Sequence, residues 1–198
     1  MCIRTITDLL PMTQQPTLTL DILYNATTVA TKQQLEKFVK PLNDGFVRYQ
    51  LNNPMRIAHF LAQICHESGE FRYQEEIASG EDYEGRTDLG NTQPGDGKRY
   101  KGRGLIQVTG RFNYGQFTKD CSYLGVDFVA NPDKLAVIPY CVYSAFWYWD
   151  SRKLNPLADR DNLTGITRII NGGMNGYDDR LKYLGLAKKA LRAAGYQV

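Results

Sequence analysis

Apolar positions recur at helical spacing in two stretches of the first half of the chain. The first stretch starts at Thr31, which stands three residues before Gln34 at the spacing of a capping box. The second starts with Asn53 and Pro54, an N-cap residue followed by a proline at the first helical position. Both patterns predict amphipathic helices, and the second extends toward Gly69. The periodic apolar residues are Leu35, Phe38, Val39 and Leu42 in the first stretch and Ile57, Phe60, Leu61 and Ile64 in the second.

Three segments of the second half also predict helices. Residues 139–149 are apolar nearly all round, which is typical of a central buried helix. Residues 163–170 run into Asn171, Gly172 and Gly173, a helix C-terminal signal. Residues 181–194 form an amphipathic and basic pattern. The chain is therefore expected to be mainly helical.

The remaining segments lack a sustained period. Residues 80–104 are rich in glycine and charge and nearly free of aliphatic side chains, so they predict a long surface loop, which in a compact domain usually has a function. Residues 105–109 fit either a strand or a buried connector. Residues 1–30 are rich in Thr and contain two prolines, so we expect a tail or lead-in, with Met12 as an alternative start. Residues 31–198 are expected to form one catalytic domain.

Length and composition narrow the class of protein. A chain of 198 residues is long enough for one core, and its mean hydropathy of −0.42 and 42% hydrophobic residues exclude a disordered or fibrous chain. No uncharged apolar run reaches the roughly 18 residues of a membrane-spanning helix. The N-terminus lacks the pattern of a secretory signal, so we expect synthesis in the cytoplasm. The cysteines are widely spaced without a C-x-x-C pair, so we interpret them as buried thiols: Cys2, Cys65, Cys121 and Cys141.

The formal net charge of +3 gives no support for nucleic-acid binding. Cations gather near the C-terminus, so the basic character is local: Arg180, Lys182, Lys188, Lys189 and Arg192. Such a helix could contact an anionic cell envelope weakly. We favour the alternative, a solvated face packed on the domain through the leucines of the same helix: Leu181, Leu184, Leu186 and Leu191.

The candidate chemistry begins at Glu67, at the end of the second predicted helix. It follows Phe60 by seven residues and Ile64 by three, so its carboxyl projects from the apolar face. A carboxyl withdrawn from water holds its proton to higher pH, and a general acid needs that proton. Glu75 and Glu76 lie in a more polar segment, where a carboxylate stays ionised. One protonated and one ionised carboxyl can cleave a glycosidic bond. The alternative is that all three glutamates simply face solvent.

Other chemistries find less support. His59 and His66 stand seven residues apart with Cys65 between them, and this pattern raises the hypothesis of a zinc site or a Cys-His protease. The two histidines lie two helical turns apart, too far for chelation from neighbouring turns, and no second ligand cluster exists, so no metal is expected. The aromatic residues 146–149 fit a packed core better than a lectin surface. The glycine-rich loop lacks a phosphate-binding pattern, so no nucleotide cofactor is expected.

Several motifs, in order along residues 54–181, resemble the family 19 glycoside hydrolases, which include chitinases and phage endolysins. The matching segments are residues 66–69 with the continuation to Glu76, residues 90–97, residues 101–115 and residues 169–173. The resemblance implies a mainly α fold of the lysozyme-like α+β superfamily. Two helical lobes would surround a substrate cleft, with a long glycine-rich loop. It also implies an inverting mechanism without a metal or cofactor.

The resemblance also implies roles for single residues. Glu67 matches the general acid of the family, and Glu76 matches the general base, although the adjacent Glu75 stays open. Thr109 falls where the family has a hydroxyl that helps to hold the attacking water. Arg180 resembles the arginine beside the catalytic acid. The other substrate-binding candidates are three amides and two rings: Gln107, Asn113, Asn171, Tyr100 and Tyr114.

From these features we predict an endolysin that cleaves the β-1,4 bonds of bacterial peptidoglycan and lyses the cell wall. Three indirect features favour peptidoglycan: the short chain, the missing secretion signal and the missing chitin-binding module. The enzyme would accumulate in the cytoplasm, act on the wall after release and work as a monomer. A chitinase that cleaves β-1,4-linked N-acetylglucosamine polymers is the alternative, and a non-catalytic sugar-binding protein is a lower one.

Overall fold

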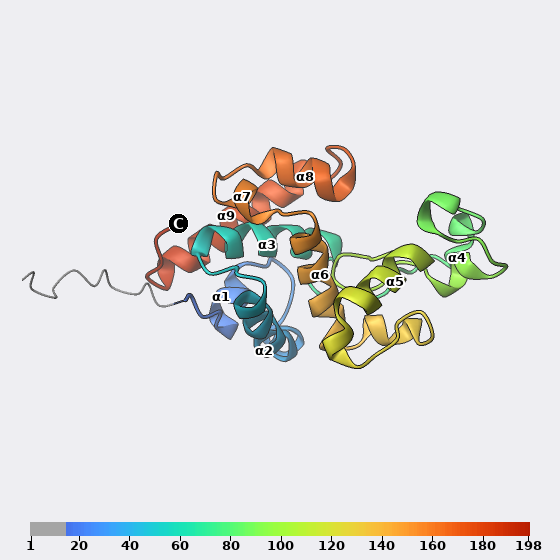
Figure 1. Ribbon diagram of the computed structural model, residues 1–198. Helices are drawn as coiled ribbons and strands as arrows, with labels where there is room; N and C mark the ends of the chain where they lie inside the picture. Colours follow the sequence, from blue (N-terminus) through green and yellow to red (C-terminus); the bar gives the residue numbers. More distant parts are fainter. Residues whose placement is uncertain (1–14) are drawn as a thin grey trace, which may run out of the picture.

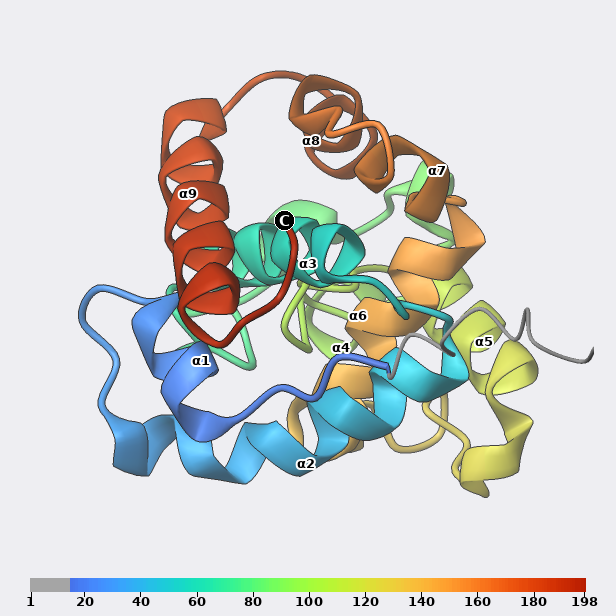
Figure 2. The same ribbon diagram turned by 90° about the vertical axis from the view of Figure 1, so that its left-hand side faces the viewer.

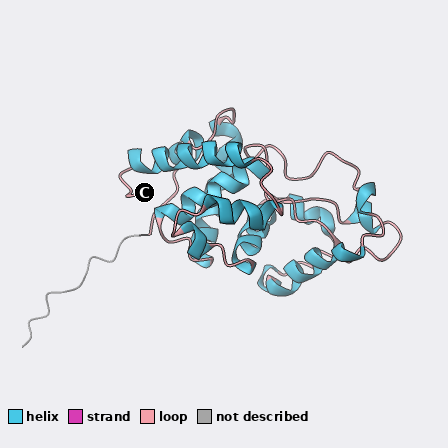
Figure 3. Ribbon diagram, turned by 90° about the horizontal axis from the view of Figure 1, so that it is seen from above, coloured by secondary structure: helices cyan, strands magenta, loops and turns pink. Residues whose placement is uncertain are grey.

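The computed structural model describes residues 15–198, which form helices joined by turns and loops (Figures 1 and 3). Within this range no strand forms, and isolated bridges join Arg103 to Glu75 and to Val108. The α-helices are α1 (Leu20–Asn25), α2 (Lys32–Arg48), α3 (Pro54–Glu67), α4 (Asp96–Arg99), α5 (Arg111–Asp120), α6 (Tyr140–Ser151), α7 (Asn155–Ala158), α8 (Leu163–Asn171) and α9 (Tyr177–Ala193). The 3-10 helices are η1 (Glu81–Tyr83), η2 (Thr87–Leu89), η3 (Ser122–Leu124) and η4 (Pro132–Ala136).

Helix α3 forms where its pattern predicts a helix, and it lies at the centre of the molecule with Ile57 to Cys65 buried. The Asn53 side chain accepts a hydrogen bond from the Arg56 backbone N–H at 2.9 Å, and Pro54 occupies the first turn. Helix α9 packs along one side of α3 and α6 crosses it (Figure 2). The Phe60 ring stacks on Phe146 of α6 with centroids 4.2 Å apart. This contact joins two helices that are far apart in the sequence and anchors the position of α3.

The other long helices confirm their local signals. The capping box at Thr31 and Gln34 is present at the start of α2. Helix α6 buries seven of its twelve residues, and α8 ends at Gly172, whose φ of 77° is the left-handed conformation that glycine tolerates. The leucines of α9 divide: Leu184 and Leu191 are buried, whereas Leu181 is 49% exposed.

The lead-in predicted for residues 1–30 is wrong for residues 15–30. This segment contains α1, which packs on α2 and α9 and belongs to the core. The segment buries Leu18, Ile22, Leu23 and Ala26. A helix of six residues is too short to show a period, so the apolar positions carried no signal in the sequence. Met12 and Cys2 lie outside the described residues.

The predicted long loop over residues 80–104 is confirmed as an irregular surface segment, but it is internally braced. It contains three short helices, η1, η2 and α4. The buried Asn91 side chain donates to the Tyr83 carbonyl at 2.9 Å and accepts from the Arg111 backbone N–H at 2.9 Å. Asp96, 1% exposed, pairs with the Arg111 guanidinium at 2.5 Å. Hydrogen bonds and an ion pair, rather than an apolar core, hold this segment together. Residues 105–109 form a turn rather than a strand.

The helices divide into two lobes (Figure 1). The larger lobe contains α1, α2, α3, α7, α8 and α9, and the smaller one contains α4, α5 and the segments around them, with α6 between the two. In the described range no helix is both long and apolar enough to cross a membrane. Cys65, Cys121 and Cys141 are buried free thiols, as predicted. The mainly helical fold expected from the sequence is therefore observed.

Candidate active site

A cleft of about 500 Å³ is lined by segments from both lobes. The end of α3, the loop from residue 76 to residue 89, residues 106–113 and the C-terminal ends of α6 and α8 all contribute to it. These segments bring together six of the residues singled out from the sequence: Glu67, Glu76, Gln107, Thr109, Asn113 and Asn171. The residues lie up to about a hundred positions apart in the chain, so their convergence is a property of the fold.

Glu67 is the last residue of α3, and its side chain is 21% exposed. Its Oε1 accepts a hydrogen bond from Arg180 of α9, which also donates to the Gln63 amide oxygen. Arg180 is fully buried and lies behind Glu67, outside the residues that line the cleft. Arg180 therefore lies beside Glu67, as the resemblance implies, but the substrate-binding role predicted for it is corrected, because its guanidinium contacts the Glu67 carboxyl away from the cleft.

Glu75 and Glu76 point in different directions, which separates two residues that the sequence left open. Glu75 pairs with Lys101 Nζ at 3.1 Å and with Arg103 Nη2 at 3.2 Å, away from the cleft. Glu76 lines the cleft, and its Oε2 accepts from the Tyr83 hydroxyl at 3.0 Å. Its Oε1 is buried without a hydrogen-bond partner in the protein. The hydrogen-bonding capacity of this atom is therefore unused in the protein.

Gly102 allows Glu76 to take this position. A Cβ at residue 102 would lie 2.9 Å from Gln107 Oε1 and 3.1 Å from Glu76 Oε2. The Glu76 backbone N–H also donates to the Gly102 carbonyl at 2.9 Å. The glycine is thus needed for the close approach of two segments rather than for backbone freedom.

The polar residues around the two carboxyls have defined orientations. Gln107 has a left-handed φ of 56°, and its amide donates to the Gly104 carbonyl at 3.0 Å. The Thr109 hydroxyl donates to the Gln107 carbonyl at 2.9 Å, which leaves the lone pairs of its oxygen free to accept. Asn113 donates to the Thr109 carbonyl at 2.8 Å. These amides and the hydroxyl suit hydroxyl and acetamido groups of a sugar.

Tyr100 does not reach the cleft, so its predicted role in substrate binding is corrected. It is 1% exposed, and its hydroxyl donates to the Val129 carbonyl at 3.1 Å. Its ring packs edge-on against Tyr114, whose hydroxyl donates to the Lys101 carbonyl at 2.7 Å. Both rings belong to the core of the smaller lobe. Their burial depends on long-range packing, which the glycine-rich context of residue 100 conceals.

Three polar side chains that the sequence analysis missed also line the cleft: Tyr83, Tyr148 and Arg152. Burial raises the pKa of Tyr83, and its hydrogen bond to Glu76 raises it further, so Tyr83 remains a donor to that carboxylate. Tyr83 lies in a loop without a period, so no signal marks it. Tyr148 and Arg152 stand four residues apart at the end of α6, and this spacing could have placed them on one helix face.

His59, His66 and Cys65 do not form the zinc site or the Cys-His pair considered from the sequence. Burial raises the pKa of the Cys65 thiol, which disfavours a thiolate nucleophile. His66 Nδ1 contacts Asp179 Oδ2 at 2.8 Å, and His59 Nε2 contacts Asp161 Oδ1 at 2.8 Å. In residues 15–198 no group of three or more potential ligands comes together to hold a metal ion. The site offers acid and base chemistry from carboxyl groups.

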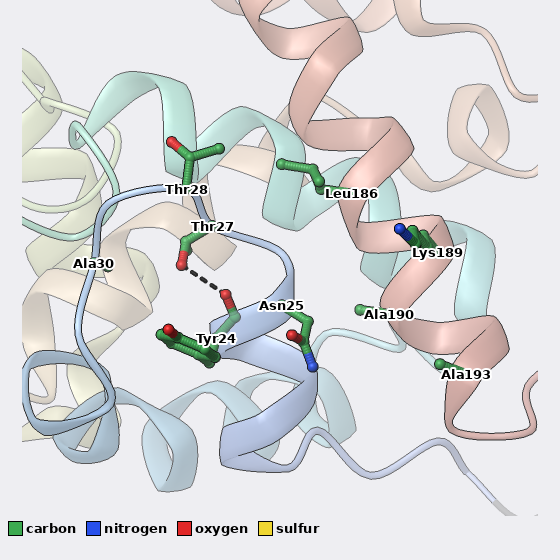
Figure 4. Close-up of a pocket in the computed structure, with 9 residues that line it drawn as sticks. All are labelled: Tyr24, Asn25, Thr27, Thr28, Ala30, Leu186, Lys189, Ala190 and Ala193. Carbon is green, nitrogen blue, oxygen red and sulfur yellow. Dashed lines mark hydrogen bonds between the residues drawn. The ribbon is translucent and has the colours of Figure 1, made fainter.

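A second hollow of about 410 Å³ lies between α9 and the segment that follows α1 (Figure 4). Its polar side chains include Asn25, Thr28 and Lys189, and the Tyr24 ring lies at its edge. None of its lining residues carries a carboxyl group. It therefore cannot supply an acid and a base of the kind found in the cleft.

Comparison with known protein sequences relates the chain to a family of hydrolases. The family described as chitinase class I matches residues 51–167. A glycosyl hydrolase family 19 domain-containing protein of Haemophilus influenzae is 35% identical over 161 residues, covering 66% of this chain and 77% of its own. An endochitinase of Arabidopsis thaliana is 41% identical over 118 residues, 59% of this chain. The match spans 39% of the length of that plant protein.

Solved structures show the same fold. A class IV chitinase from Zea mays has a TM-score of 0.65 at 20% identity and covers 89% of this chain and 91% of its own. Chitinase C from Streptomyces griseus has a TM-score of 0.64 at 22% identity, covering 85% of this chain and 77% of its own.

Proposed function

This chain belongs to the family 19 glycoside hydrolases, and from that premise we propose that it cleaves β-1,4 bonds between N-acetylated amino sugars with inversion. One observation carries the proposal: Glu67 and Glu76 line one cleft from separate segments and have different surroundings. Glu67 rests on a buried guanidinium, whereas Glu76 has one carboxylate oxygen without a protein donor. Two carboxyls in unlike environments are what an acid and a base require.

In the proposed reaction Glu67 gives its proton to the oxygen of the leaving sugar. The carboxylate that remains carries a negative charge, and the Arg180 guanidinium lies against it. A charge balanced in advance lowers the free energy of the state in which the bond breaks. Arg180 acts here through Glu67 and does not touch the substrate.

Glu76 lines the cleft and takes a proton from the attacking water. Tyr83 holds one carboxylate oxygen of Glu76, which fixes the orientation of the group. Thr109 lies in the same cleft with its oxygen free to accept a hydrogen bond from that water. Water that attacks the face opposite the leaving oxygen inverts the anomeric carbon.

The relatives named above favour chitin as the substrate, since the plant protein is an endochitinase and the structural neighbours are chitinases. Peptidoglycan is the second candidate. It offers the same β-1,4-linked acetamido sugars, and the bacterial relative that matches most of the chain is named for its domain and not for a substrate. We propose a monomer for either polymer. Synthesis in the cytoplasm followed by release belongs to the peptidoglycan alternative.

The test is to incubate the protein separately with chitin oligomers and with peptidoglycan sacculi and to identify the products by mass spectrometry. Glu67→Gln serves as the control for a contaminating enzyme. We expect shorter N-acetylglucosamine oligomers from chitin. The anomer formed first, observed by NMR, should be the inverted one.

Muropeptides with a new reducing sugar end, from sacculi alone, would replace the chitinase proposal with the endolysin. Absence of products from both substrates would overturn the enzymatic proposal and support a sugar-binding protein. Cell fractionation would separately test where the protein accumulates.

A further inference from the structure

Arg152 is the one cation among the described residues that line the cleft. It directly follows the last residue of α6, where the negative end of a helix favours a positive side chain. Its guanidinium carbon lies 3.3 Å from the centroid of the Tyr148 ring. The planar group is therefore held on an aromatic face inside the cleft.

Tyr148 is a firm support for this guanidinium. Its hydroxyl donates to the Ile170 carbonyl at 3.4 Å, a long hydrogen bond that links the end of α6 to α8. Burial raises the pKa of Tyr148, so the phenol stays neutral and keeps this hydrogen bond. Because the support is fixed, the guanidinium loses little freedom when it binds a ligand.

Arg152 has no carboxylate partner within residues 15–198. Its hydrogen bond runs from Nη1 to the Ser151 hydroxyl at 3.0 Å. Other arginines near the cleft differ: Arg180 pairs with Glu67 and Arg111 pairs with Asp96. A guanidinium that keeps most of its N–H groups free beside a cleft can bind a carboxylate through two parallel hydrogen bonds.

We propose that Arg152 recognises a carboxylate carried by the substrate. This inference rests on the proposed function and adds charge selectivity to it: the cleft prefers a glycan of N-acetylated amino sugars with anionic side groups over a neutral one. Chitin, the substrate that the named relatives favour, has no such group, so Arg152 is the feature of this chain that favours the peptidoglycan candidate. Peptidoglycan has such groups, because its stem peptides carry carboxylates. Arg152 therefore acts as a specificity residue that draws an acidic side group toward the wall formed by α6 and α8.

The test compares three substrates: soluble peptidoglycan strands, the same strands with their carboxylates amidated, and an N-acetylglucosamine hexamer. Amidation removes the charge and leaves the sugar chain in place. For the unaltered protein we expect KM to be about fivefold lower on the native strands than on the amidated strands, the size of effect given by a partly exposed charge pair. Added salt should reduce this ratio.

Arg152→Gln should bring the ratio of the two KM values close to one. Arg160→Gln is the matched control, because it removes the same group from an exposed position that does not line the cleft. It should keep the ratio of the unaltered protein. Arg152→Lys keeps the charge without the planar stack and should give an intermediate ratio.

The proposal is overturned if the unaltered protein hydrolyses both strands with equal KM, a result that needs no variant to fold. It is also overturned if Arg152→Gln raises KM on all three substrates by the same factor, because that indicates a structural role. Failure of the proposed function looks different: the unaltered protein and Arg160→Gln would then cleave none of the three substrates.

Discussion

The two carboxyl groups of the cleft are held by different kinds of structure. Glu67 ends a central helix and rests on Arg180, which is buried between α3 and α9. Glu76 lies on an irregular segment and depends on one tyrosine hydroxyl and the close approach of Gly102. The side of the proposed acid, Glu67, thus relies on packing and a buried charge, and the side of the proposed base, Glu76, relies on shape and single hydrogen bonds.

This difference shows how one domain can hold two carboxyl groups for which we propose different roles, an acid and a base. A buried ion pair is costly to break, because either partner left alone is an unpaired charge away from water. A loop position is cheaper to disturb, because side chains can shift without unfolding a helix. We therefore expect substitutions on the acid side to affect stability as well as chemistry, and substitutions on the base side to affect chemistry mostly.

The largest loss of turnover is expected for Glu67→Gln. The amide keeps the shape of the side chain but cannot supply the proton, so kcat should fall by at least about 10²-fold. Thermal unfolding should still be cooperative, because the amide oxygen can accept from Arg180. Retention of the original kcat would remove Glu67 from its role as acid.

A comparable loss is expected for Glu76→Gln, and almost none for Glu75→Gln. Glu76 lines the cleft, whereas Glu75 pairs with Lys101 and Arg103 outside it. The pair of variants is compared by kcat on one substrate and by binding of an unreacted oligomer. If Glu75→Gln were the more damaging change, the base would have to be reassigned to Glu75.

A smaller loss is expected for Gly102→Ala, which acts on the base side through geometry. The new methyl group would press on the ends of the Gln107 and Glu76 side chains, which can shift at the cost of the Tyr83 hydrogen bond. We expect kcat to fall about tenfold, on the order seen for misplaced catalytic groups, with the unfolding midpoint nearly unchanged. Gly110→Ala is the contrasting variant: its Cβ would lie 2.6 Å from the Leu89 carbonyl at a φ of 92°, so stability itself should fall.

The smallest effect on turnover at neutral pH is expected for Glu70→Gln, because Glu70 contributes to the stability of the structure around Glu67. Burial alone would raise the pKa of Glu70, but hydrogen bonds from Thr28, Val29, Tyr183 and Ala30 outweigh it and lower the pKa to about 2. The ionised form is the one held in the folded protein. The contribution of Glu70 to the free energy of unfolding is therefore complete above the ordinary pKa of 4.5 and is lost as the pH falls toward 2.

The lowered pKa of Glu70 corresponds to about 3 kcal/mol of unfolding free energy that disappears across this range. Denaturant unfolding between pH 5 and 2, a range that spans the ordinary and the lowered pKa of Glu70, measures this loss of stability. Glu70→Gln should be less stable at neutral pH and should lose less stability on acidification. Equal pH dependence of both proteins would contradict the assignment.

Much of the fold was predictable because its signals are local. The capping box at Thr31, the Asn53 and Pro54 start of α3 and the glycine that ends α8 each depend on a few neighbouring residues. The pairing of residues across the cleft could not be predicted in this way. Glu67 and Arg180 are 113 positions apart, and only the packing of α9 on α3 brings them together.

The sequence by itself determined the helical class and the main helix boundaries, because periodicity and capping act over a few residues. Its resemblance to the family 19 glycoside hydrolases identified six of the residues that line the cleft, but Tyr83, Tyr148 and Arg152 were missed. The tertiary structure alone decided that Glu76 and not Glu75 faces the cleft, that Tyr100 is buried and that Arg152 lines the cleft. These outcomes depend on which segments meet. Contacts between distant segments are selected by the packing of the whole core, and no local pattern records them.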